Sequence, residues 1–183
     1  IRDKRRKYYA FTLYQDEEKS NNLFIGTSNA VISISKNNNS WFKNFEITFN
    51  DAIRDIEYEN NELWLCTGFN GIKRIHNVAD TSKRKIISYG KEDGLPLLKT
   101  NYIERYNDRL IFLTEKGLYK FDSKDEKFVK DNVFGKSYTQ GSKGVYRFVQ
   151  DKYGNIYTSV ANNDPDNKRY WVECITPIAD SEY

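Results

Sequence analysis

The 183-residue sequence contains no methionine, one histidine, two cysteines and three prolines. Because methionine is absent, we expect the sequence to be a segment of a longer protein. A Ser–His–Asp arrangement would have to use the single histidine, His76, and nothing in the sequence arranges one around it. One histidine and two distant cysteines make no zinc site. We therefore predict no catalytic residue, no metal ligand and no cofactor, and we expect Cys66 and Cys174 to be buried, unpaired thiols.

Long apolar runs and a strong charge imbalance are also missing. No stretch approaches the roughly 20 apolar residues that span a bilayer, and no signal peptide is present. The 29 basic residues nearly balance the 26 acidic ones, and a net charge of +3 does not predict nucleic-acid binding. A local basic cluster, formed by Arg2 and residues 4–7, is expected to be a solvated edge, although it could also meet a phosphate or a membrane surface.

Aromatic residues, by contrast, are abundant. The 14 Tyr, 11 Phe and 3 Trp favour half-buried β-strands. Four segments align with one another, at residues 22–27, 62–67, 109–114 and 155–160. One column of this alignment holds Phe24, Trp64, Ile111 and Tyr157, which are 40, 47 and 46 residues apart. A period of roughly 40–50 residues is typical of a four-stranded propeller blade.

Each repeat is interpreted as four strands joined by turns rich in Asn, Asp and Gly. In the second repeat we expect strands at residues 53–58, 63–67, 71–76 and 85–89. The second strand is apolar on both faces, as a strand packed between two sheets should be. The outer strand is placed at residues 41–45 or 46–49 in the first repeat and at 127–130 in the third. We predict an all-β fold of about four four-stranded antiparallel β-propeller blades, at about residues 8–50, 51–99, 100–143 and 144–183.

The repeats resemble the two-component regulator propeller repeat. A blade of that family contains a Leu-Trp-Ile-Gly-Thr strand, then a Gly-Leu strand, and an Asp-Gly-Leu-Pro connection between blades. Leu63–Thr67 with Gly71 and Ile72 is similar to the two strands, and Gly90–Pro96 is similar to the connection. The third repeat lacks the Trp, and the fourth lacks the Gly-Thr and carries an insertion at 162–169.

The resemblance implies a setting for the chain. Such repeats form the extracytoplasmic sensor region of bacterial hybrid two-component proteins, in sets of seven blades followed by a β-sandwich, a membrane span and a histidine kinase. It thus implies a single fragment (residues 1–183) of a seven-bladed propeller in a periplasmic location. The implied partners are the remaining blades, the β-sandwich, a second copy of the parent protein and an oligosaccharide ligand released from a polysaccharide.

The expected blade geometry also selects candidate binding residues. If the first strand of each blade is innermost, the turns between the second and third strands share one face with the connections between blades. Loops on a rigid scaffold commonly carry recognition residues. Arg54 and Tyr146 occupy equivalent places near the start of a first strand. The predicted ligand-binding residues are Arg54, Phe69, Asn70, Asn101 and Tyr146.

Other roles for these residues stay open. Aromatic and amide side chains suit a sugar, and Arg54 suits a carboxylate, but Arg54 could instead pair with Asp51 or Asp55. Phe69 could pack on a neighbouring blade. Three functions therefore remain: a sensor that binds or relays a carbohydrate-derived ligand, a propeller scaffold for protein–protein interaction or dimerisation, and an enzyme that uses paired carboxylates. Turn and surface roles explain the acidic residues equally well.

Overall fold

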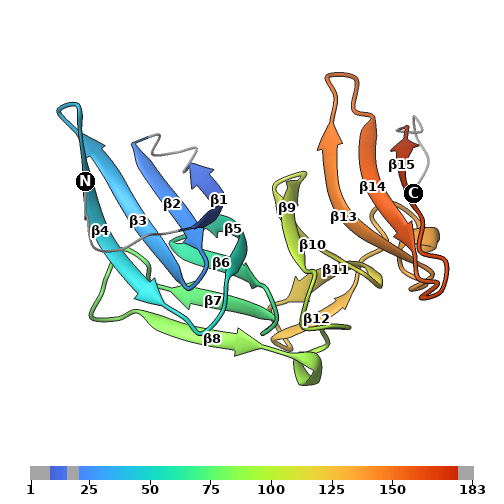
Figure 1. Ribbon diagram of the computed structural model, residues 1–183, viewed down its shortest axis with the longest axis horizontal. Coiled ribbons are helices and arrows are strands. Elements are labelled where there is room, and N and C mark those ends of the chain that lie inside the picture. Colours follow the sequence, from blue (N-terminus) through green and yellow to red (C-terminus); the bar gives the residue numbers. More distant parts are fainter. Residues whose placement is uncertain (1–8, 16–20, 177–183) are drawn as a thin grey trace. The chain divides into compact units, whose positions relative to one another are not determined.

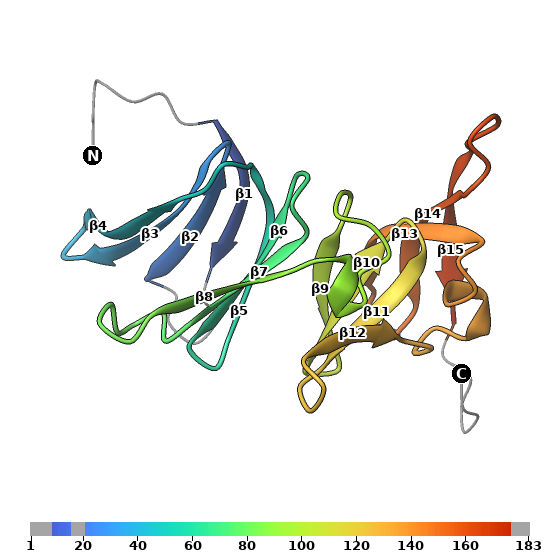
Figure 2. The same cartoon turned by 90° about the horizontal axis from the view of Figure 1, so that it is seen from below.

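Four antiparallel β-sheets follow one another along the chain in the computed structural model, which describes residues 9–15 and 21–176 (Figure 1). Each of the first three sheets has four strands and the last has three, and neighbouring strands follow sequence order (Figure 1, Figure 2). Within these described ranges the helical structure consists of two short 3-10 turns, Lys91–Asp93 and Lys136–Tyr138. The all-β, blade-type fold is confirmed. The basic cluster at residues 2–7 lies outside the described residues.

The first two sheets belong to one compact unit, residues 1–89, called unit 1. The first sheet contains β1 (Ala10–Gln15), β2 (Asn22–Thr27), β3 (Ala30–Asn37) and β4 (Ser40–Thr48). The second sheet contains β5 (Ile53–Glu59), β6 (Glu62–Thr67), β7 (Ile72–His76) and β8 (Lys85–Tyr89). The two positions considered for the outer strand of the first repeat are joined in one long strand, β4, which bulges at Asn44.

The other two sheets belong to a second compact unit, residues 90–183, called unit 2. The third sheet contains β9 (Tyr102–Tyr106), β10 (Arg109–Thr114), β11 (Gly117–Asp122) and β12 (Lys127–Lys130). The fourth sheet contains β13 (Lys143–Gln150), β14 (Ile156–Asn162) and β15 (Tyr170–Ile175). The expectation of four strands is therefore not met by the described part of the fourth sheet.

Recurrent turn chemistry explains why these segments form hairpins. Asn60 and Asn61 between β5 and β6 have φ angles of 49° and 62°, and the residues between β9 and β10 likewise have positive φ. Two successive residues with positive φ are typical of the tight turn that matches the twist of a β-hairpin, and Asn tolerates this conformation. At the opposite end of the sheets, the hydroxyls of Thr27, Thr67 and Thr114 donate to backbone carbonyls three or four residues ahead. The threonine of the repeat therefore closes the turn between second and third strands.

Each unit has its own apolar core between its two sheets. In unit 1 the second strand of the second sheet is buried on both faces, as predicted, with Leu63, Trp64, Leu65 and Cys66 all buried. Gly26 lies where β5 approaches β2, because a Cβ added there would be 2.9 Å from the Ile53 carbonyl oxygen. The glycine of the repeat thus allows neighbouring blades to pack closely.

Unit 2 departs from the alignment at its last sheet. The side chains of Tyr106, Ile111, Val145 and Phe148 belong to its core, but Tyr157, the fourth member of the aligned column, is 39% exposed. Tyr157 lies on the face of β14 opposite to Ile156 and Val160, which are the residues that enter the core. The aligned column is therefore buried at its first three members but not at its last.

Three further features complete the fold. Both cysteines are unpaired; Cys66 is buried as predicted, but Cys174 is exposed, because it shares the outer face of the fourth sheet with Tyr157, its pairing partner on β14. His76 ends β7, where its Nδ1 lies 2.5 Å from the Glu62 carboxylate. Across the described residues, helical segments are all too short to cross a lipid bilayer.

Candidate binding surfaces

The first strands of three sheets carry a β-bulge at the same point. The ladder skips one residue between β1 and β2, between β5 and β6, and between β13 and β14. The skipped residues are Phe11, Arg54 and Tyr146. A bulge redirects the side chain of the extra residue, and bulges occur often beside functional sites. Arg54 and Tyr146 were predicted to be equivalent from sequence, and Phe11 is the third member of this set.

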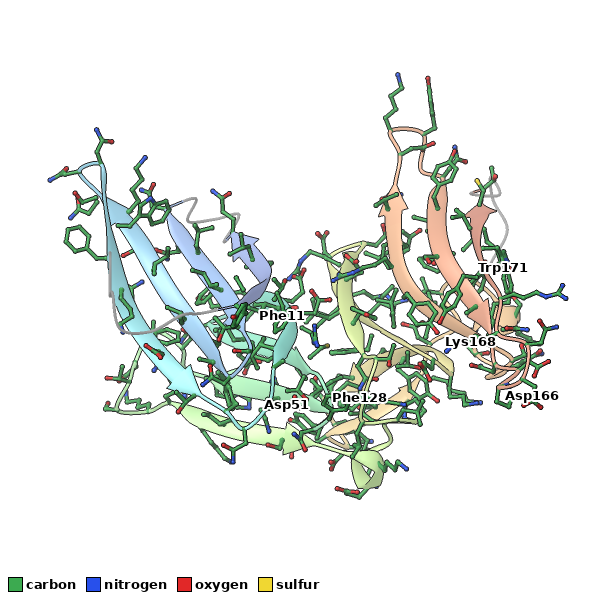
Figure 3. The ribbon with its side chains drawn as sticks, in the orientation of Figure 1. Phe11, Asp51, Phe128, Asp166, Lys168 and Trp171 are labelled. Carbon is green, nitrogen blue, oxygen red and sulfur yellow. The ribbon has the colours of Figure 1, made fainter. Side chains whose placement is uncertain are left out.

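In unit 1 two of these bulged residues contact one another. The guanidinium carbon of Arg54 lies 4.0 Å from the centroid of the ring of Phe11, which is labelled in Figure 3. Arg54 is exposed, and Phe11 remains 45% exposed. Within the described residues Arg54 forms no ion pair, so the alternative pairing with Asp51 or Asp55 is not observed. The cation and the ring together form a flat, accessible surface.

A second feature of unit 1 is a loop held by one carboxylate. Asp51, between β4 and β5, accepts hydrogen bonds through Oδ2 from the backbone N–H groups of Phe69 (2.8 Å) and Asn70 (2.9 Å) and from the Asn70 side-chain amide (2.9 Å). Its Oδ1 accepts from Ala52 N–H at 2.7 Å. The loop that carries Phe69 is therefore fixed to the connection before β5, while the Phe69 ring is 69% exposed.

The electrostatics of Asp51 follow from these contacts. Burial alone would raise the pKa of this carboxyl, but the hydrogen bonds from Phe69, Ala52 and Asn70 stabilise its charged form. The pKa of Asp51 consequently lies below its ordinary value of 3.8. The loop is thus organised by a carboxylate that stays ionised near neutral pH.

In unit 2 the bulged Tyr146 lies in a cluster of aromatic and charged side chains. Its ring centroid is 5.8 Å from that of Tyr170 and 6.4 Å from that of Tyr102. The Lys168 ammonium lies 5.9 Å from the Tyr146 ring centroid and 5.6 Å from that of Tyr170 (Figure 3). Tyr170 is 64% exposed. We call Tyr102, Tyr146, Lys168 and Tyr170 the tyrosine cluster.

Hydrogen bonding in the tyrosine cluster is incomplete. The Tyr146 hydroxyl is buried and forms no well-aligned hydrogen bond with any residue that the structure describes. The Lys168 ammonium is nevertheless close enough to this hydroxyl that their interaction raises the pKa of Lys168. Burial raises the pKa of Tyr146, and the neighbouring Lys168 charge partly opposes that shift. Both groups therefore keep their neutral-pH forms, a phenol and an ammonium.

The position of Lys168 depends on two local features. Its ammonium lies 3.4 Å from the Glu115 carboxylate, which follows β10. A Cβ on Gly144 would come within 3.0 Å of the Glu115 Cα, so a residue without a side chain lets this loop approach β13. The insertion at 162–169 is also ordered, because the Asn162 side-chain oxygen accepts from Arg169 N–H at 2.7 Å. The insertion therefore places the Lys168 ammonium beside Tyr146, the bulged residue of β13.

Asn101, the remaining predicted residue, has a different environment. It precedes β9, is only 1% exposed and donates from its side-chain amide to the Leu97 carbonyl at 3.1 Å. In the part of the chain that the structure describes, its side-chain oxygen accepts no hydrogen bond. Asn101 therefore lies below the surface, and it is not grouped with the tyrosine cluster.

A neighbouring network in unit 2 is saturated with hydrogen bonds. The Glu173 carboxylate on β15 accepts from the Tyr138 hydroxyl (2.5 Å), the Trp171 indole (2.9 Å) and the Lys143 ammonium (2.8 Å). These bonds connect β15 to β13 and to the 3-10 turn that contains Tyr138. Since the oxygens of Glu173 are engaged in this way, the network has a structural role.

Sequence reasoning missed several of these contributors. Aligning the first strand of the first repeat with residues 53–56 and 145–148 would have found Phe11, since it matches Arg54 and Tyr146 in position. Lys168 belongs to the insertion at 162–169, but nothing in the sequence pairs it with Tyr146. Among the described residues, His, Cys, Asp and Glu side chains do not gather in any group of three that could hold a metal ion.

Comparison with known proteins adds evidence on the fold. The chain matches no protein-family model and no curated protein. A solved structure, the extracellular domain of a one-component system from B. thetaiotaomicron, matches 88% of this chain with a TM-score of 0.58 and 18% sequence identity. The matched part is 22% of that longer chain, so this chain spans about a fifth of its length. At this identity the likeness shows the fold alone.

Two further solved structures match more weakly. One is a chain in the complex of S. cerevisiae Dbp5 with Nup159 and Gle1, with a TM-score of 0.42 and 8% identity over 90% of this chain and 47% of that one. The other is PorZ, a surface component of the type-IX secretion system of Porphyromonas gingivalis, with a TM-score of 0.39 and 10% identity over 92% of this chain and 30% of that one. Neither supports a functional argument.

Proposed function

We propose that this chain is a non-catalytic, ligand-binding segment of a sensor protein and that its ligand is a saccharide. The observation that carries the proposal is the tyrosine cluster, in which Lys168 and the exposed Tyr170 ring lie beside Tyr146, the bulged residue of β13. Aromatic faces with a polar tip suit sugars, whose rings present C–H groups on one side and hydroxyls at the edge. The likeness to an extracellular domain supports an extracytoplasmic location.

Binding is a better account of the site than catalysis. Several carboxylates that could have formed a catalytic pair hold turns instead: Asp51 fixes the loop at 68–70, Asp93 accepts from Gly90 N–H, and Asp151 accepts from Asn155 N–H. A general acid or base must be able to reach a substrate proton. Carboxylates whose oxygens are engaged by backbone donors are poorly suited to that task.

At the level of the parent protein, the proposal extends to a periplasmic sensor of a two-component system that responds to polysaccharide breakdown products. The remaining blades of a seven-bladed propeller, the β-sandwich and a second copy of the parent are its proposed partners. The exposed pair Arg54 and Phe11 and the ordered Phe69 loop are proposed as a further contact surface in unit 1. This segment is not proposed to bind nucleic acid.

The test is calorimetric titration of the 183-residue chain with a panel of neutral and acidic oligosaccharides. We expect saturable heat with at least one of them and a loss of affinity of about tenfold or more in Tyr170→Ala, because an exposed ring that stacks on a ligand behaves as a binding hot spot. Tyr153→Ala is the matched control, since Tyr153 is similarly exposed (74%) on the β13–β14 turn. The absence of binding heat with every oligosaccharide, or an equal loss of affinity in both variants, would contradict the proposal.

A second candidate function is a protein-interaction scaffold. One face of the fourth sheet exposes Val149, Val172 and Tyr157. The strand register pairs Val149 with Tyr157 and places Val172 two residues further along the same face, opposite Ser159. Contiguous exposed apolar residues on a sheet commonly mark a surface that another protein covers. This observation favours further blades or a second copy as the partner of the fourth sheet.

Light scattering after size exclusion tests this second candidate. If the face mediates association, the apparent mass should rise with protein concentration, and Val172→Lys should abolish the rise. Val129→Lys on β12 is the control, since Val129 is also exposed but lies in another sheet. A constant monomer mass at every concentration would remove the scaffold function from this face.

A further inference from the structure

Unit 1 contains a cavity at the end of β5 opposite to Arg54. Its volume is about 320 Å³, and side chains from β2, β3, β4, β5 and the β7–β8 connection line it. Tyr58, near the end of β5, is one of the lining residues. Small-molecule sites typically have volumes of about 300–1,000 Å³. The cavity is therefore large enough for a small molecule and is separate from the surface formed by Arg54 and Phe11.

Arg84 gives this cavity its charge. It is the one charged side chain among the described residues that line the cavity. Its guanidinium lies 4.1 Å from the Phe45 ring centroid and donates through Nη2 to the Val78 carbonyl at 2.5 Å. Its buried Nε has no hydrogen-bond partner among the described residues, and burial lowers the pKa of Arg84. A partly desolvated cation whose donors are incompletely used favours an anion beside it.

Aromatic rings also line the cavity. The Phe24 ring centroid lies 5.2 Å from that of Tyr58 and 6.4 Å from that of Phe45. The polar lining residue Asn44, the bulged residue of β4, is held by hydrogen bonds to the Ser33 and Ser35 hydroxyls (3.1 Å and 2.9 Å). The rings and the amide are therefore already fixed in place, which lowers the entropy lost when a ligand binds.

We propose that this cavity binds a small carboxylate whose body is a ring or another compact apolar group. The carboxylate accepts a charge-assisted hydrogen bond from the Arg84 guanidinium. The apolar body packs against Phe45 and Tyr58. The site lies apart from the tyrosine cluster of unit 2 and does not depend on the saccharide-binding role of that cluster.

Three probes separate the two parts of this recognition. Benzoate carries both the charge and the ring, benzamide keeps the ring without the charge, and acetate keeps the charge without the ring. Each is titrated into the ¹⁵N-labelled 183-residue chain while backbone amide signals are recorded. We expect benzoate to shift the signals of Val78, Ala79 and Arg84 in a saturable way, with affinity about tenfold or more above that of benzamide, because hydrogen bonds to charged groups are the stronger ones. Acetate should bind more weakly than benzoate.

Two variants and one matched control assign the effect to the cavity. Arg84→Gln should weaken benzoate binding by about tenfold or more. Lys85→Gln removes the same charge from the next residue, which is exposed on β8 and does not line the cavity, and should leave binding unchanged. Ala79→Phe places a ring in the cavity without altering the guanidinium and should also abolish binding. It decides the matter if Arg84→Gln disturbs the fold of unit 1.

Several results would overturn the proposal. One is the absence of saturable shifts with benzoate. Another is equal affinity for benzoate and benzamide, since the charge would then have no part in binding. Equal affinity for acetate and benzoate would likewise show that the aromatic lining residues contribute nothing to binding. Unchanged benzoate binding in Ala79→Phe would place the ligand outside the cavity.

Discussion

Arg54 and Tyr146 occupy the same backbone position in two different sheets, yet they take opposite parts in similar contacts. In unit 1 the bulged residue is the cation, and the ring is supplied by Phe11, the bulged residue of the neighbouring sheet. In unit 2 the bulged residue is the ring, and the cation is Lys168 from a turn. The repeat therefore fixes where a side chain is presented, while the residue type decides what that position can bind.

The turns beside these positions differ in the same way. In unit 1 the loop that carries Phe69 is short and is anchored by Asp51, 18 residues earlier in the chain. In unit 2 the corresponding turn is longer and is closed mainly from within, as in the bond from Arg169 N–H to Asn162. The first arrangement leaves Arg54 exposed, whereas the second brings Lys168 over Tyr146. The same bulged strand thus presents an exposed Arg54 in unit 1 and a Tyr146 ring with Lys168 beside it in unit 2.

The largest effect should come from adding a side chain at Gly26, where β2 packs closely against β5 in unit 1. In Gly26→Val, a Cβ at this position would lie 2.6 Å from the Thr12 side chain and 2.9 Å from the Ile53 carbonyl oxygen. Such overpacking should lower the free energy of unfolding by about 3 kcal/mol. Chemical denaturation measures this change.

A matched control for Gly26→Val is Ser28→Val, which introduces the same side chain at an exposed turn position two residues later. Its unfolding midpoint should stay close to that of the unchanged chain. If Gly26→Val were equally neutral, close approach of β5 to β2 would not be what the glycine provides, and the packing argument for unit 1 would be wrong.

The next largest effect should come from the carboxylate that anchors the loop in unit 1. Asp51→Asn weakens several charge-assisted hydrogen bonds, and the local stability of the loop should fall by about 1–3 kcal/mol. Hydrogen exchange of the Phe69 and Asn70 amides should speed up accordingly. Asp164→Asn is the comparison in unit 2, where the carboxylate accepts hydrogen bonds from just two described groups, the backbone N–H groups of Asp166 and residue 167. Asp164→Asn should speed up amide exchange in its own loop less than Asp51→Asn does. A larger effect of Asp164→Asn would contradict the idea that Asp51 is the stronger anchor.

The anchoring by Asp51 should also depend on pH. Because the pKa of Asp51 in the folded protein lies below its ordinary value of 3.8, folding stabilises the charged form. That stabilisation is fully present above the unfolded pKa and is lost as the pH falls through the folded pKa. Protection of the Phe69 amide should therefore be constant near neutral pH, decline below about pH 4 and show no such decline in Asp51→Asn.

The regular parts of this structure could be predicted from the sequence. The position of β6 at residues 62–67 follows from an apolar run between turn residues, and the hairpin turn at Asn60 and Asn61 follows from residue types that tolerate positive φ. The equivalence of Arg54 and Tyr146 also followed from aligned repeats. Each of these features depends on residues that are close together in the sequence.

The features that escaped prediction depend on residues far apart in the sequence. Lys168 contacts Glu115, which is 53 residues away in the sequence, and no local sequence pattern predicts that contact. Tyr157 matched the repeat in sequence, but its burial depends on what covers its sheet, which a single repeat does not encode. The cavity beside Arg84 combines four strands and a connection, so its shape emerged only from the packing of the first two sheets.

A smaller effect should be seen in the ionisation of Tyr146. Lys168→Met removes a positive charge that favours the phenolate, so the pKa of Tyr146 should rise further above its ordinary value. NMR titration with ring-labelled tyrosine follows this change. Lys152→Met is the control, because Lys152 lies over Tyr153, 4.9 Å from its ring centroid, and should leave Tyr146 unaffected. A fall in the pKa of Tyr146 on loss of Lys168 would contradict the described geometry.

The smallest effect concerns the contact between Arg54 and Phe11. A double-mutant cycle with Arg54→Gln and Phe11→Leu should give a coupling energy of about 0.5 kcal/mol, since cation–π contacts at exposed sites are weak. Unfolding of the four proteins by denaturant supplies the values. A coupling near 2 kcal/mol would mean that the cation is desolvated in the fold and committed to the ring. A weak coupling leaves the guanidinium free to exchange the ring for a ligand at little cost, which is the property that a contact surface in unit 1 requires.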